Sequence, residues 1–164
     1  MQVILDEKKY RALWDRVYRE YGFDREQEAW LRPPFPHKKY RLAQLWTEEQ
    51  ERTVNSIFQA LCPGDMYALD WQHDCMVFSP AEEIPLNFSF YDRERDCNVY
   101  FPSYFPNGDF YFFISADWRI VLFGHPWRSE IYVTGDALIA AFDSAREQLD
   151  LTEIPLEKEN PICE

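Results

Sequence analysis

Residues 110–123 read FYFFISADWRIVLF, with two apolar runs on either side of Ala116-Asp117. Both runs are rich in aromatic and β-branched residues, which strands prefer. The two-residue gap predicts an antiparallel hairpin. Because aromatic side chains occupy both faces of Phe110–Ile114, we expect a central strand buried on both sides. The alternative is that one face is open, as an exposed aromatic patch for a partner.

Sequence periodicity outside this hairpin predicts helices before and after a run of strands. Apolar residues at helical spacing and the capping box Thr47-Glu48-Glu49-Gln50 support the helices, and alternation with short turns supports an antiparallel sheet. We expect helices over 6–21, from 47 to about 62 and over 136–149, and further strands over 40–46, 66–77, 86–91, 97–101 and 131–134.

The predicted fold class is α+β. It consists of a mainly antiparallel sheet of about five or six strands, with two N-terminal helices and one C-terminal helix on one face. Residues 1–149 are expected to form a single domain, and residues 150–164 an acidic, flexible tail.

The composition is acidic and rich in aromatic residues. The 164 residues include 29 acids and 17 bases, for a net charge of -12, and 18% are aromatic. Residues 1–60 hold 10 acids and 11 bases, whereas residues 61–164 hold 19 acids and 6 bases. This charge repels phosphate, so nucleic acid and anionic membranes are excluded as partners, and a basic protein is favoured.

The cysteines and the absence of targeting signals indicate the compartment. No apolar run approaches the roughly 18 residues that span a membrane, and residues 1–10 lack the features of a secretory signal. The 4 cysteines contain no CxxC pair. We therefore expect reduced thiols in the cytoplasm, and no cofactor.

Three motifs combine Trp or His with acidic and aromatic neighbours. They are YALDWQHDC at residues 67–75, PNGDFYFF at 106–113 and FGHPW at 123–127. With these motifs the chain resembles a bacterial family known as domain of unknown function 2716. The resemblance implies a bacterial, cytosolic, single-domain protein and brings no established reaction or catalytic residue.

Asp70, His73, Asp74, Cys75 and His125 form the one dense set of reactive side chains in the sequence. A histidine with carboxylates suits a divalent metal or acid–base catalysis, which makes Asp70, His73 and His125 the candidate catalytic residues. On a regular strand, however, Asp70 and Asp74 face away from His73 and Cys75. The favoured interpretation is therefore that Trp71 and His73 pack in the core and that no metal is bound. An apolar setting would also raise the pKa of the Cys75 thiol, which opposes nucleophilic catalysis.

The loop at residues 124–127 is a candidate binding element, because Gly124 and Pro126 restrict its backbone and fix His125 and Trp127 in place. The alternative is a tight connection with Trp127 folded onto the core. Most other acids, Asp109 among them, are expected to form a solvated rim. The candidate binding residues are Asp70, Trp71, Asp74, Asp117, His125 and Trp127.

Three functions remain open. The favoured one is a non-enzymatic, acidic protein-binding module of immunity or antitoxin type, which masks a basic, toxin-like protein. The second is a small metal-binding protein or hydrolase-like enzyme built on Asp70, His73, Asp74 and His125. The third is a small-ligand binder with an aromatic pocket lined by residues such as Tyr111, Trp118 or Trp127.

Overall fold

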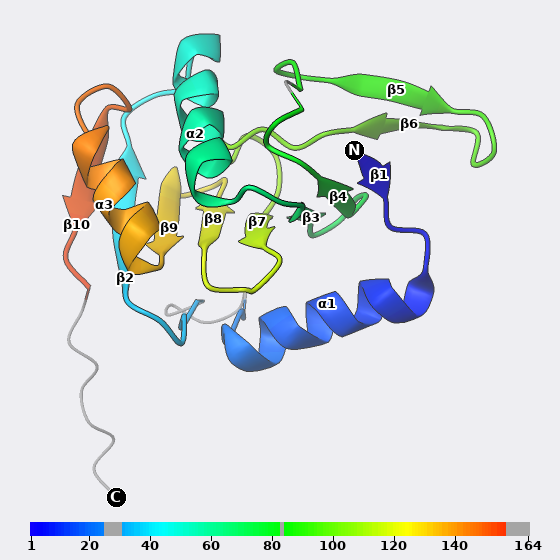
Figure 1. Ribbon diagram of the computed structural model, residues 1–164, viewed down its shortest axis with the longest axis horizontal. Helices are drawn as coiled ribbons and strands as arrows, with labels where there is room; N and C mark the ends of the chain where they lie inside the picture. The colour runs from blue at the N-terminus through cyan, green and yellow to red at the C-terminus, as the bar shows by residue number, and fades with distance from the viewer. Residues whose placement is uncertain (25–30, 83, 157–164) are drawn as a thin grey trace, which may run out of the picture.

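The computed structural model describes residues 1–24, 31–82 and 84–156, which contain three helices and ten strands (Figure 1). The helices are α1 (Glu7–Glu20), α2 (Glu48–Leu61) and α3 (Asp136–Ser144), and the strands are β1 (Gln2–Val3), β2 (His37–Leu42), β3 (Met66–Asp70), β4 (Met76–Phe78), β5 (Ser89–Asp92), β6 (Cys97–Tyr100), β7 (Tyr111–Ser115), β8 (Val121–His125), β9 (Glu130–Thr134) and β10 (Leu151–Ile154).

Eight strands form one sheet in the order β1-β4-β3-β7-β8-β9-β2-β10, and every neighbouring pair is antiparallel. β5 and β6 form a separate two-stranded hairpin that extends from the main body (Figure 1). The predicted hairpin over 110–123 is confirmed, with Phe112 opposite Phe123. Every residue of β7, β8 and β9 is buried, so the expected double-sided burial of the central strand is also confirmed.

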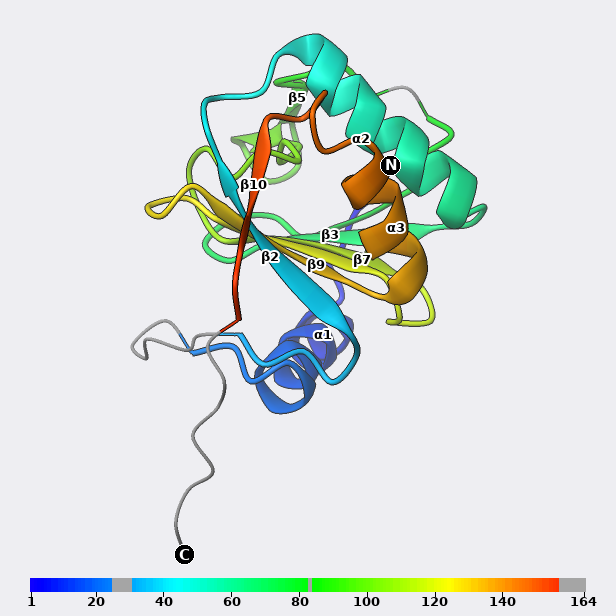
Figure 2. The ribbon, with the colours of Figure 1, turned by 90° about the vertical axis from the view of Figure 1, so that its left-hand side faces the viewer.

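The helices cover both faces of the sheet (Figure 2). α2 and α3 lie over one face, where Val54, Phe58 and Leu138 share a core with alternate sheet residues. α1 lies over the other face, where Trp14 and Val17 pack with the remaining sheet residues. The fold is therefore three layers with the sheet in the middle.

The helix starts follow the predicted capping chemistry. Asp6 caps α1 by accepting hydrogen bonds from the backbone of Lys8 and Lys9. Thr47 and Gln50 form the reciprocal capping box of α2, which the sequence predicts. Each cap satisfies backbone donors that have no partner within the helix.

The α+β fold class with a mainly antiparallel sheet is confirmed, with differences in detail. The sheet has eight strands rather than five or six, and α1 lies on the face opposite α2 and α3. The predicted strand over 66–77 is two strands, β3 and β4, joined by a turn over 71–75. β10 pairs with β2 within the segment predicted as a flexible tail, and residues 157–164 lie outside the described residues. No described helix has the length and apolar character that crossing a bilayer requires.

Candidate functional site

The three sequence motifs meet at one end of the sheet. Asp70, the last residue of β3, lies opposite Tyr111 at the start of β7, and Tyr111 lies opposite Gly124 near the end of β8. The backbone amide of Trp71 continues this pairing by donating to the carbonyl of Phe110 at 3.2 Å. Segments 67–75, 106–113 and 123–127 thus become neighbours because their strands are antiparallel and in this register.

Asp70, His73 and Asp109 form a cluster at this end of the sheet. Nδ1 of His73 lies 3.0 Å from Oδ1 of Asp70 and 3.9 Å from Oδ2 of Asp109. Asp70 is only 6% exposed and Asp109 only 4% exposed, whereas the side chain of His73 is 66% exposed, so the expectation that His73 packs in the core is wrong. One potential ligand atom from each residue lies within 4.8 Å of the other two.

The protonation of the cluster follows from its burial and its contacts. Burial raises the pKa of Asp70, and the contact with His73 only partly offsets this. The hydrogen bond with Asp70 raises the pKa of His73, and the charge of Asp109 adds to the effect. The turn over 71–75 therefore brings together a carboxyl group and an imidazole that a regular strand would separate.

His125 lies on the other face of the sheet. Alternation along β8 places it with Phe123, next to α1, and its ring centroid is 5.2 Å from that of Phe110. Burial lowers the pKa of His125 to about 3, and the positive charges of Arg128 and Lys39 contribute. The imidazole is therefore neutral at pH 7, and His125 is not part of the Asp70–His73–Asp109 cluster.

Tyr18, Trp71 and Trp127 form an aromatic patch, in which Trp71 and Trp127 contact the buried ring of Phe110. Trp127 is 69% exposed, and its ring centroid lies 4.9 Å from that of Phe110 in an edge-to-face contact. The ring centroid of Trp71 is 6.0 Å from that of Phe110, and its Nε1 donates to the hydroxyl of Tyr18 at 3.0 Å. The sequence left open whether Trp127 folds onto the core, and here it is exposed at the surface with a buried ring beneath it.

Asp74 is engaged away from the cluster. Nη1 of Arg95 lies 2.5 Å from Oδ1 of Asp74, and Nε of Arg95 lies 2.7 Å from Oδ2 of Asp92. These contacts attach the β5–β6 hairpin to the turn over 71–75. Of the four residues of the predicted metal or catalytic site, the structure brings together Asp70 and His73, and it separates Asp74 and His125 from them.

Comparison with known proteins places the chain in a family. The model of a family described as "Protein of unknown function (DUF2716)" matches residues 4–139. The chain belongs to the DUF2716 family. It is also 43% identical, over 79 residues, to the uncharacterized protein YxiI of Bacillus subtilis (strain 168).

The match to YxiI covers 48% of this chain and 44% of the relative, so the chain spans less than half the length of the relative it matches. No solved structure was found to match the chain. The descriptions of the family and of this relative name no biochemical role.

Two further predicted residues are not part of the Asp70–His73–Asp109 group of this DUF2716 protein, although Sγ of Cys75 donates to the backbone carbonyl of Asp70 at 3.8 Å. Cys75 is 1% exposed, and burial raises the pKa of its thiol to about 11, so the thiol is protonated at neutral pH. Asp117 lies in the β7–β8 turn, at the opposite end of these strands from Asp70. There it accepts hydrogen bonds from the Ser115 hydroxyl and the Arg119 amide, which hold the turn.

Sequence reasoning assigned Asp109 to a solvated rim, and the structure buries it beside Asp70. The sequence does indicate that Asp109 lies at the end of the sheet, because it directly precedes the strand over residues 110–115 and follows the turn residues Asn107-Gly108. Its proximity to Asp70, however, depends on the pairing of β3 with β7, which segments far apart in the sequence do not reveal.

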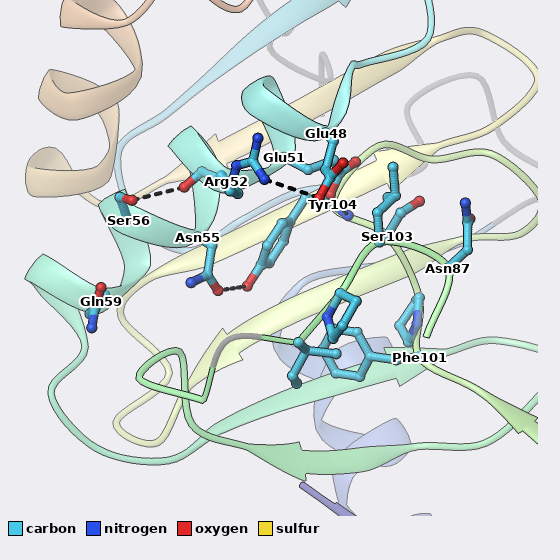
Figure 3. Close-up of a pocket in the computed structure, with 14 residues that line it drawn as sticks. Glu48, Glu51, Arg52, Asn55, Ser56, Gln59, Asn87, Phe101, Ser103 and Tyr104 are labelled. Carbon is cyan, nitrogen blue, oxygen red and sulfur yellow. Dashed lines mark hydrogen bonds and ion pairs between the residues drawn. The ribbon is translucent and has the colours of Figure 1, made fainter. Parts of the chain in front are cut away.

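A cavity of about 260 Å³ lies between α2 and the loops that flank the β5–β6 hairpin (Figure 3). Glu51, 7% exposed, lines it and accepts hydrogen bonds from the backbone amides of Phe105 and Tyr104, both at 2.9 Å. The hydroxyl of Tyr104 donates to Oδ1 of Asn55 at 2.7 Å. None of the aromatic residues proposed from sequence to line a pocket, Tyr111, Trp118 and Trp127, lines this cavity.

Proposed function

We propose that this chain is a non-enzymatic, acidic protein-binding module of the cytoplasm, of immunity or antitoxin type. In this proposal the aromatic patch of Tyr18, Trp71 and Trp127 contacts a basic, toxin-like protein. The single observation that carries the proposal is the state of Trp127, which is 69% exposed while its ring rests on that of Phe110.

Trp127 combines two properties of an interface anchor. Its exposed indole offers a large apolar area, and tryptophan is among the residues enriched at the energetic centres of interfaces. Its edge-to-face contacts with Phe110 and His125 hold the ring before a partner arrives. A side chain that is already ordered loses less conformational entropy on binding, so more of its contact energy contributes to affinity.

The charge of the protein supports a basic partner. The net charge is -12, and all of the excess acid lies beyond residue 60, in the part of the chain that includes β3 to β10. A field of this sign accelerates the encounter with a positively charged protein and is screened by salt. Salt-sensitive association is therefore the expected signature.

The test is capture of bacterial lysate proteins on the immobilised chain at low and high salt, with wild type compared with Trp127→Ala. We expect a basic polypeptide to bind the wild type at low salt. Truncating a central aromatic costs at least about 2 kcal/mol, so Trp127→Ala is expected to weaken the dissociation constant about 30-fold or more.

Tyr100→Ala is the matched control, because Tyr100 is an aromatic of similar exposure, 61%, on the β5–β6 hairpin, away from the patch. The control variant is expected to bind as the wild type does. Equal capture by wild type and Trp127→Ala, or binding that does not respond to salt, would contradict the proposal.

A further inference from the structure

Two carboxylates and an imidazole converge where β3 ends and β7 begins. Asp70 closes β3, Asp109 lies two residues before the start of β7, and the turn over 71–75 returns His73 toward both. Antiparallel pairing of Asp70 with Tyr111 fixes the distance between the two aspartates. The register of the sheet therefore determines the positions of the two aspartates, and the cluster does not depend on long, flexible side chains.

Both aspartates are largely buried, and few groups of the protein contact their carboxylates. Oδ1 of Asp109 accepts the amide of Phe110 at 2.7 Å, and Oδ1 of Asp70 accepts from His73 at 3.0 Å and from the amide of Gln72 at 3.4 Å. Within residues 1–24, 31–82 and 84–156, the Oδ2 atoms of Asp70 and Asp109 accept no hydrogen bond.

The charge of the cluster is also unbalanced. His73 is the one basic side chain within ion-pair distance of either aspartate in the described part of the chain. Two buried carboxylates that share one imidazole carry excess negative charge in a position where charge is costly. This deficit points to a cation.

We propose that Asp70, His73 and Asp109 bind a divalent transition-metal ion, Mn²⁺ or Zn²⁺, through one carboxylate oxygen each from the aspartates and Nδ1 of the histidine. Two carboxylates and one imidazole form a mixed oxygen and nitrogen ligand set. Imidazole favours transition metals over Mg²⁺ and Ca²⁺, and carboxylates bind both Mn²⁺ and Zn²⁺. The two positive charges of the ion balance the two aspartates.

The distances fit such an ion. Bonds to oxygen and nitrogen are about 2.0–2.2 Å long, so ligands on opposite sides of one ion lie about 4.2 Å apart. The three ligand atoms lie within 4.8 Å of one another, so the outermost pair has to approach by less than about 1 Å. Nδ1 of His73 already lies 3.0 Å from Asp70 and 3.9 Å from Asp109, so any longer separation is the one between the two carboxylate oxygens, and rotation of the carboxylate groups has to supply the approach. The exposed side of the cluster leaves room for water ligands, as in sites with three protein ligands.

The inference is independent of the proposed partner, because the metal would join β3, the turn over 71–75 and the start of β7 whether or not a protein binds. The experiment uses the full chain without an affinity tag, treated with chelator and then titrated with MnCl₂. Free Mn²⁺ is measured by electron paramagnetic resonance, and thermal unfolding is followed in parallel. MgCl₂ serves as the control for divalent charge and ionic strength.

We expect Mn²⁺ to bind with a stoichiometry of one and to raise the unfolding temperature, because a ligand that binds only the folded state stabilises it. Asp109→Asn and His73→Gln are each expected to weaken the Mn²⁺ dissociation constant about 10-fold or more. Asp74→Asn is the matched control, since it removes a neighbouring carboxylate that pairs with Arg95, and it should bind Mn²⁺ as the wild type does.

His73→Gln keeps the test valid if Asp109→Asn fails to fold, because His73 lies on an exposed turn. Failure of the wild type to bind either Mn²⁺ or Zn²⁺ would overturn the proposal and leave protons as the only cations of the cluster. Undiminished binding by His73→Gln would also overturn it. A Co²⁺ spectrum with thiolate charge-transfer bands would place the ion on a cysteine, with the same consequence.

Discussion

The neutral, buried His125 gives a quantitative prediction of stability against pH. Burial lowers the pKa of His125 from 6.5 to about 3. Below pH 6.5 the unfolded chain binds a proton at this position that the folded chain does not bind. The free energy of unfolding therefore falls as the pH falls from about 6.5 toward 3, with a slope of about 1.4 kcal/mol per pH unit.

The perturbation is His125→Phe, which keeps a ring against Phe110 and removes the titrating group. At pH 4.5, two units below the pKa of 6.5 in the unfolded chain, the wild type should have lost about 2.7 kcal/mol more than the variant, relative to pH 8. The difference at pH 8, where the imidazole is neutral in both states, isolates the change in packing. The other titrating groups contribute equally to the free energy of unfolding of both proteins, so their contributions cancel in the difference to first order.

The assay is urea unfolding followed by tryptophan fluorescence and circular dichroism at a series of pH values. The quantity compared is the free energy of unfolding of the wild type minus that of His125→Phe. Parallel curves from pH 8 to pH 4.5 would refute the reasoning, because they would mean that the imidazole takes up its proton as readily in the folded chain as in the unfolded one.

Three further substitutions or modifications test local features. Glu51→Gln replaces one of the two oxygens that accept the backbone amides of Tyr104 and Phe105 with an NH₂ donor. Urea unfolding should therefore show a free energy of unfolding lower by about 1–3 kcal/mol. Glu49→Gln, at an exposed position, is the control and should show almost no change. Gly124→Ala places a Cβ 2.7 Å from Cβ of Pro106 and should lower the free energy of unfolding by about 1–3 kcal/mol. Gly64→Ala is the control, because its new Cβ meets open space and should not show this packing cost. Equal effects of the two substitutions on the free energy of unfolding would contradict the packing argument. Cys75, with a thiol pKa of about 11, should resist iodoacetamide at neutral pH in the folded protein and react after unfolding. Peptide mass spectrometry measures the modification, and rapid modification of the native protein would contradict the burial of Cys75.

Local sequence signals predicted the features whose physics is local. The capping residues Asp6 and Thr47, and the hairpin over 110–123, depend on neighbours a few residues away. The turn over 71–75 escaped detection because it contains neither glycine nor proline, and the alternation of residue types continues through it. Its geometry relies in part on the side chain of Asp70, which accepts the amide of Gln72.

The features that sequence could not predict depend on long-range pairing. The amphipathic pattern of α1 shows that one helix face is buried and does not show against which face of the sheet it packs. The cluster of Asp70 with Asp109 requires β3 to lie beside β7. Within the candidate site, sequence therefore identified Asp70, His73 and Trp127 as individual residues, while their true neighbours emerged only from the fold.

The position of β2 has a consequence for how the chain acquires its structure during synthesis. Tyr40, in β2, pairs with Ile131 on one side and with Glu153 on the other, so both neighbours of this early strand come from the last part of the chain. A ribosome must add roughly ninety more residues before the first of them exists. Until then the nascent chain carries a strand with two open edges, including the apolar Tyr40 and Leu42, and closing so distant a contact slows folding. Both edges of β2 therefore stay without their partner strands until nearly the whole chain has been made.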